Sequence, residues 1–187
     1  MKTVFILLLA CVALSSCKSV APKTFYLLGD SQWLAPAPEA EVNVLVGIGP
    51  IELAGFLNRP QLVYQGQDGA IHVATGHVWA EPLEKGVART LGMKLTAQNP
   101  ARAFVYFPWR QDSKPEKSVR VQIHNIFRAA ETVGLQATWV VVVAGADGAM
   151  TYHHFNKQVS AKPDSEGLVD GLNQLLSLLA EDVDKAL

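Results

Sequence analysis

Only two segments of this chain show the apolar periodicity of an amphipathic helix, and the other patterned segments are typical of β-strands. After Glu81-Pro82, apolar residues recur every four positions from Leu83 to Leu95, which predicts the first helix. The capping segment Pro163 to Glu166 predicts the start of the second. The second helix carries an apolar stripe of Leu168, Leu172, Leu175, Leu176, Leu179 and Val183. Two helices cannot cover both faces of a large sheet, so we expect an α+β fold with the helices mainly on one side.

The strand-like segments occur on both sides of the first helix, giving the order strands, helix, strands, helix. From Val42 to Ile48, branched residues occupy every second position, which predicts a central strand that Gly49-Pro50 breaks or bends. Asp68-Gly69 lies between two strand-like runs and predicts a hairpin. The remaining strand-like runs are residues 25–28, 103–107, 119–129, 135–144 and 150–159. We expect an antiparallel or mixed sheet of about seven to eight strands, whose uncovered face needs water, a partner or a ligand.

The N-terminus resembles a bacterial lipoprotein signal. Lys2 precedes the apolar run Val4 to Leu14, and Leu14-Ser15-Ser16-Cys17 resembles a lipobox. In that pattern the cysteine thiol is alkylated by diacylglycerol and the preceding bond is cut. We therefore expect a signal peptide over residues 1–16, a lipidated N-terminus and tether over 17–23, and a single periplasmic α+β domain over 24–187. Several acyl chains on Cys17 would anchor the protein to a membrane.

Composition excludes several classes of function. Removing residues 1–16 leaves 171 of the 187 residues, enough for one domain, and takes the net charge from −1 to about −2, so no nucleic-acid partner is expected. The two cysteines are Cys11, in the discarded signal, and Cys17, so the mature chain has no free thiol. The longest later apolar run, Val140 to Ala144, is too short to span a membrane.

No residue pattern supports catalysis or metal binding. His72, His77 and His124 are isolated in the sequence, and the adjacent His153 and His154 should point to opposite faces of a strand. No zinc-binding, nucleotide-binding or serine-hydrolase motif occurs. We therefore expect a protein that is not an enzyme, with no metal site and no cofactor other than the covalent lipid on Cys17.

The aromatic residues are more informative. Trp139 lies in an apolar strand and Trp79 lies beside the first helix, so both are expected to pack in the interior. Phe104 to Phe107 lead into Pro108-Trp109-Arg110, where an aromatic strand end enters a loop. This strand end is the best candidate for an exposed aromatic contact surface, with ordinary burial as the alternative.

Three further motifs resemble one family of envelope proteins. They are Val46 to Leu53 (VGIGPIEL), Phe56 to Val63 (FLNRPQLV) and Trp79 to Leu83 (WAEPL), and they follow the lipobox in order. Together they are similar to the ABC-type transport auxiliary lipoproteins, the paraquat-inducible protein C family, over nearly the whole mature chain. The chain departs from that pattern at Val78, where an arginine is common, and at Ala54-Gly55.

The resemblance implies a non-enzymatic membrane-integrity lipoprotein of the outer membrane that faces the periplasm. Its implied partner is an MCE-domain protein of an inner-membrane complex that moves lipids between the membranes. The alternatives are a free-standing structural or stress-response lipoprotein and, with less support, an envelope hydrolase. The candidate partner-binding residues are Asn58, Arg59, Gln61, Phe107, Trp109 and Arg110. Whether Glu52 pairs with Arg59 or faces a partner is left open.

Two expectations concern sorting and assembly. Lys18 follows the lipidated cysteine, whereas aspartate at that position is the common signal for inner-membrane retention, so we expect the outer membrane. The uncovered sheet face and the aromatic residues near Trp109 are expected to leave apolar surface that a monomer would have to hide. We therefore expect a homo-oligomer, such as a ring that matches the symmetry of an MCE assembly. A monomer whose long loops, such as Gly29 to Ala40, cover that face is the alternative.

Overall fold

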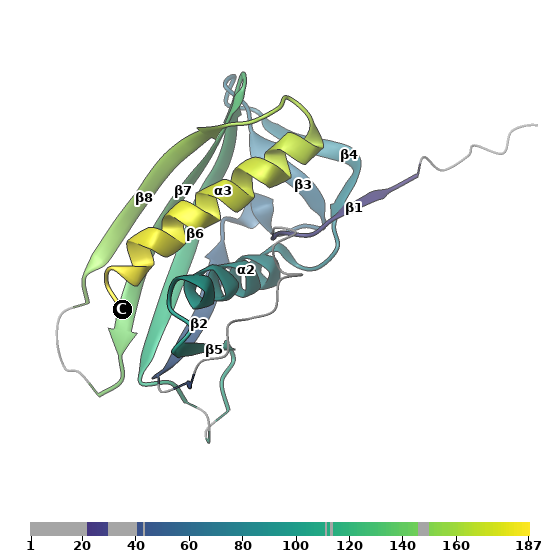
Figure 1. The fold of residues 1–187 in the computed structure, drawn as a ribbon. Helices are drawn as coiled ribbons and strands as arrows, with labels where there is room; N and C mark the ends of the chain where they lie inside the picture. The colour runs from purple at the N-terminus through teal and green to yellow at the C-terminus, as the bar shows by residue number, and fades with distance from the viewer. Residues whose placement is uncertain (1–21, 30–40, 43, 111, 113, 146–149) are drawn as a thin grey trace, which may run out of the picture.

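The protein forms a mixed sheet covered by two long helices (Figure 1). The computed structural model describes residues 22–29, 41–42, 44–110, 112, 114–145 and 150–187. In chain order the elements are β1 (Thr24–Tyr26), β2 (Val44–Leu53), the 3-10 helix η2 (Gly55–Leu57), β3 (Gln61–Gln65), β4 (Ile71–Trp79), α2 (Leu83–Gln98), β5 (Arg102–Tyr106), β6 (Lys117–Ala129), β7 (Thr132–Val143), β8 (Tyr152–Ser160) and α3 (Ser165–Asp184). The predicted α+β class, the mixed sheet and the order strands, helix, strands, helix are confirmed.

The sheet divides into two branches along the long strand β6. One edge of β6 pairs antiparallel with β7, which pairs antiparallel with β8. The other edge is shared, because β2 runs parallel to the stretch Lys117 to Ile123 and β3 meets Phe127 farther along. β5 lies parallel beside β2, whereas β4 and then β1 extend the branch that begins with β3. The two branches therefore diverge between β2 and β3, where η2 lies.

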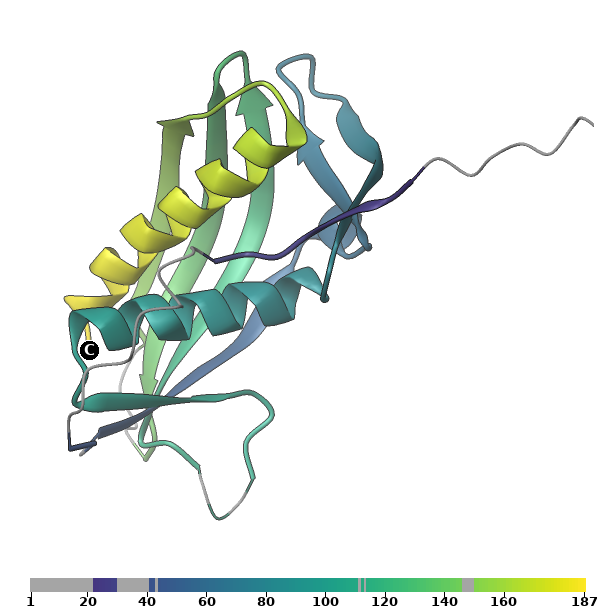
Figure 2. The ribbon, with the colours of Figure 1, turned by 45° about the vertical axis from the view of Figure 1, so that its right-hand side comes forward.

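Both helices lie on the same face of the sheet, as Figures 1 and 2 show. The predicted stripes face the core: Leu83, Val87, Leu91 and Leu95 of α2 are buried, as is every member of the α3 stripe. The Asp164 carboxylate caps α3 by accepting a hydrogen bond from the Gly167 amide at 2.7 Å. The core therefore lies between the helices and every second strand residue, on the side of the sheet that faces the helices. Among these residues are Ile48, Val121 and Leu135.

The opposite face of the sheet is not covered by either helix, and it is mostly polar over β6, β7 and β8. Strand alternation places on it Gln122, His124, Gln136, Thr138, His154, Asn156 and Gln158. The three β8 residues in this set are exposed. Water can solvate these amides, imidazoles and hydroxyls, so the part of the face that they occupy does not present the expected apolar surface. Phe127, Val140 and the exposed Tyr152 lie on the same face.

Local details confirm some sequence expectations and correct others. The hairpin at Asp68-Gly69 joins β3 and β4, and Trp79 and Trp139 are buried. β2 does not end at Gly49-Pro50 but continues to Leu53, with a register shift against β6 between Ile48 and Ile51. Pro82 is the N-cap of α2 rather than its first residue. The bend predicted in the central strand is therefore present as an irregularity inside one strand.

Candidate functional site

Two open grooves lie side by side at the start of α2. The first, of about 320 Å³, lies between the turn that contains Asn58 and Arg59 and the beginning of the helix. The second, of about 360 Å³, lies between the irregular part of β2, the end of β5 and the first turns of α2. Glu81 and Glu84 line both grooves. We call this region the α2-start surface, defined by the residues that line the two grooves.

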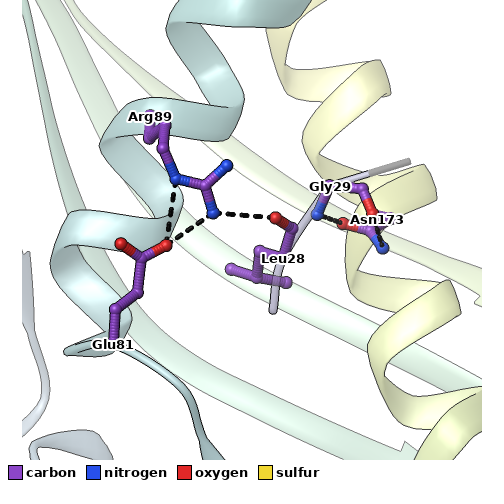
Figure 3. Close-up of polar contacts among 5 residues, drawn as sticks. All are labelled: Leu28, Gly29, Glu81, Arg89 and Asn173. Carbon is purple, nitrogen blue, oxygen red and sulfur yellow. Dashed lines mark hydrogen bonds and ion pairs between the residues drawn. The ribbon is translucent and has the colours of Figure 1, made fainter. Parts of the chain in front are cut away.

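Arg89, which forms an ion pair with Glu81 at the start of α2, also hydrogen bonds to the N-terminal segment, residues 22–29 (Figure 3). Arg89 donates to the same Glu81 oxygen from Nε at 3.0 Å and from Nη2 at 2.5 Å, and Nη2 also donates to the Leu28 carbonyl oxygen at 2.9 Å. On the α3 side, the buried Asn173 accepts from the Gly29 amide at 2.6 Å. Charged and amide side chains thus hold the backbone of this segment against both helices.

Tyr106, the last residue of β5, lines the second groove. Its ring is partly exposed, whereas its hydroxyl lies against α2, where a Cβ on Gly92 would sit 2.7 Å from it. Burial raises the pKa of the Tyr106 hydroxyl, and the positive charge of Arg89 opposes that rise. Gly92, which weakens α2 intrinsically, therefore serves close packing between the helix and this aromatic residue.

The structure gathers some of the predicted partner-binding residues and separates others. Asn58 and Arg59 line the first groove, and the exposed Phe107 lines the second. Gln61 is the first residue of β3, opposite Val78, and it lines neither groove. Asn58, Arg59 and Phe107 therefore belong to one surface, whereas Gln61 does not.

Trp109 and Arg110 are directed elsewhere. The Trp109 indole packs over Gly47, where a Cβ would lie 2.6 Å from its ring, and its Nε1 donates to the Val105 carbonyl oxygen at 3.2 Å. Phe107 meets it edge to face, with ring centroids 5.3 Å apart. Arg110 is exposed and pairs with Asp112 at 3.3 Å. Trp109 is therefore a partly buried packing residue. The predicted lipidation site, Cys17, lies outside the described residues.

Sequence reasoning missed Glu84 and Lys85, which line the second groove, and placed Tyr106 in the aromatic strand end without naming it as a partner-binding residue. A signal for the two helix residues was present, because the apolar stripe of α2 leaves the positions after Leu83 on a different helical face. Nothing local in the sequence could have shown that β5 brings Tyr106 to this place. Glu52 lies opposite Gln122 on β2, and in the described part of the chain it forms no ion pair with Arg59.

The histidines do not form a metal site. Within the described ranges no group of three or more potential ligands from His, Cys, Asp and Glu comes together. His153 stacks on Trp139, while His154 and His124 both approach the Thr138 hydroxyl, at 3.5 and 2.8 Å. The prediction that His153 and His154 point to opposite faces is confirmed.

The helices of the described segments include none with the length and apolar character that a membrane span needs.

Comparison with known proteins assigns the class. The chain belongs to the family described as ABC-type transport auxiliary lipoprotein component, whose model matches residues 26–184. The resemblance inferred from the three motifs is therefore confirmed, and it places the protein among envelope lipoproteins.

Two crystal structures are similar to it. One, of an uncharacterized protein, has a TM-score of 0.70 and 18% identity and covers 88% of this chain and 98% of that chain. The other, of a protein from Xanthomonas campestris, has a TM-score of 0.62 and 11% identity and covers 86% and 92% of the two chains. At these identities the similarity shows a shared fold. Among curated proteins no sequence match was found.

Proposed function

We propose that this lipoprotein is a non-enzymatic docking subunit of a trans-envelope lipid transport system, held in the outer membrane by the lipid on Cys17. The observation that carries the proposal is membership of a transport auxiliary lipoprotein family over residues 26–184. The partner proposed is the periplasmic MCE-domain protein of an inner-membrane complex. The α2-start surface supports this role, because it offers two adjacent open grooves rather than an enclosed cavity.

The chemistry of the α2-start surface suits a protein partner. Its exposed aromatic residues, Tyr106 and Phe107, lie beside Lys85 and Glu84, and Arg59 is exposed on the other side of the helix start. Aromatic and arginine side chains are the types most enriched where proteins bind one another. A partner segment that places apolar side chains in the second groove and an acidic group near Arg59 would complement it.

Site-specific crosslinking tests the docking role. A photoreactive amino acid at Arg59 or Phe107 should capture the MCE-domain protein from the native envelope. The same residue at Tyr152, which is exposed on β8 at the far edge of the sheet, should capture much less and serves as the matched control. Equal capture at Tyr152 and Phe107, or no MCE-domain protein at either groove position, would refute docking through this surface.

Sorting and assembly are tested separately. If Lys18 is permissive for export to the outer membrane, Lys18→Asp should move the protein to inner-membrane fractions; a native protein already found there would refute the outer-membrane placement. The homo-oligomer remains a prediction. The polar residues on the open face of β6, β7 and β8 do not support the argument from an apolar face. Sedimentation of the chain lacking residues 1–17 should show a species larger than a monomer if the prediction holds.

A further inference from the structure

The N-terminal segment, residues 22–29, presents two apolar side chains to solvent. Phe25 is 67% exposed and Leu27 is 47% exposed. The residues between and after them point the other way: the Tyr26 hydroxyl hydrogen bonds to His77 Nδ1 at 2.9 Å, and Leu28 is buried in the core. Because side chains of extended chain alternate in direction, holding Tyr26 and Leu28 inward forces Phe25 and Leu27 outward.

This orientation is fixed by the rest of the molecule. β1 pairs in parallel with β4, with Phe25 opposite Val78, and the Arg89 and Asn173 contacts hold Leu28 and Gly29 on the helices (Figure 3). Turning the strand to hide Phe25 would expose Leu28 and break these hydrogen bonds. The two apolar side chains are therefore a permanent feature of the folded surface rather than one rotamer of a loose tail.

The length of chain before this segment limits what Phe25 can face. Cys17 precedes Pro22 by five residues, so its Cα lies at most about 18 Å from that of Pro22 even when the chain is fully extended. Pro22 itself lies at β4, where a Cβ on Gly76 would be 3.5 Å from its carbonyl oxygen. With acyl chains on Cys17, the end of the molecule formed by β1 and β4 must stay close to the bilayer surface.

We propose that Phe25 and Leu27 insert into the headgroup region of the membrane to which Cys17 is anchored, and so set the orientation of the domain on that membrane. The proposal rests on the lipid anchor of the proposed function. An apolar pair held near a bilayer by a tether binds at high effective concentration, so a contact too weak to hold a free protein suffices. The exposed Lys23, two residues before Phe25, adds a cation that anionic headgroups attract.

Labelled cysteine variants of the lipidated protein test this contact. Because Cys17 is acylated, Phe25→Cys or Leu27→Cys supplies a single free thiol for an environment-sensitive fluorophore. The matched control is Tyr152→Cys, since Tyr152 is also an exposed aromatic residue on a strand, 61% exposed, but lies in β8 at the other side of the sheet. The protein is reconstituted in vesicles of phosphatidylethanolamine and phosphatidylglycerol that contain a lipid-borne quencher.

The expected result is a loss of roughly half of the emission at positions 25 and 27 and of less than about a tenth at position 152. Vesicle flotation of the same samples separates this contact from the anchor. Protein that floats with unquenched probes at 25 and 27 overturns the membrane contact and leaves the anchor intact, whereas protein that does not float overturns both. If the probes at 25 and 27 are shielded from water in detergent without vesicles as strongly as in vesicles, a second copy of the chain covers this site. That result also overturns the proposal.

Discussion

The two faces of β7 are formed by alternate residues of one strand, yet most of their positions differ in character. On the covered face of β7, the buried residues of the core are Val133, Leu135, Ala137 and Trp139. On the other face of the same strand, positions such as Gln136 and Thr138 meet polar neighbours from β6 and β8. An uncovered sheet face is therefore not by itself evidence for a hidden partner, because its side chains decide whether water is enough.

The largest expected change in the free energy of unfolding comes from a substitution on the covered face. Leu175→Ala removes a fully buried side chain from the α3 stripe, and the cavity it leaves should lower the free energy of unfolding by about 2–5 kcal/mol. The matched change on the open face is Asn156→Ala, at an exposed position of β8, which should change it by less than about 0.5 kcal/mol. Urea unfolding followed by circular dichroism measures both. Comparable losses would contradict the division of roles between the faces.

The second prediction concerns the part of the open face that Trp109 covers. A Cβ at position 47 would lie 2.6 Å from both the Trp109 ring and the Pro115 ring, so Gly47→Ala should displace Trp109 and destabilise the fold by about 1–3 kcal/mol. Tryptophan fluorescence should shift in the folded variant. Gly55→Ala is the control, because a Cβ there meets nothing within 4 Å. A Gly47→Ala protein with native stability and fluorescence would show that Trp109 does not pack there.

These contrasts show what the sequence could predict. The helix stripes, the hairpin and the order of elements follow from periodicity and turn residues within one segment, as the buried Leu83 to Leu95 spacing illustrates. The polar open face was readable too, since His154, Asn156 and Gln158 alternate along one strand. The sharing of one edge of β6 by two strands could not be predicted from the sequence. The pairing of β2 with one half of β6 and of β3 with the other depends on contacts between distant segments. For the same reason the grouping of Arg59 with Phe107 at the start of α2 needed the structure.

The third prediction tests the polar contacts that hold the N-terminal segment on the covered side. Asn173→Ala leaves the Gly29 amide and carbonyl groups without their side-chain partner, which should lower the free energy of unfolding by about 1–2 kcal/mol. Hydrogen exchange should also become faster in residues 22–29. Its neighbour Gln174 is exposed, so Gln174→Ala should alter neither quantity. Unchanged exchange in the Asn173 variant would indicate that β1 pairing and the Arg89 contact hold the segment without Asn173.

The smallest expected effect is a pH-dependent contribution at the rim where α3 meets β8. The Lys157 ammonium, which donates to Asp182 at 2.7 Å, lowers the pKa of that carboxyl below its usual 3.8; partial burial opposes this, and Lys185 adds to it. A carboxyl whose pKa is lowered by folding stabilises the protein above its unfolded pKa, and this stability is lost as the pH falls through the folded pKa. Because the pair is partly exposed, Asp182→Asn should cost only about 0.2–1 kcal/mol near neutral pH.

That cost should shrink toward zero as the pH falls below the folded pKa of Asp182, since the carboxyl is then protonated in both the folded and the unfolded protein. Urea unfolding of the wild type and the variant across acidic pH measures the difference. Asp170→Asn is the control for loss of one negative charge, because Asp170 is exposed on the same helix and forms no ion pair within the described residues. A difference between wild type and Asp182→Asn that does not change with pH would mean that the side-chain amide, rather than the lost charge, sets the stability at this rim.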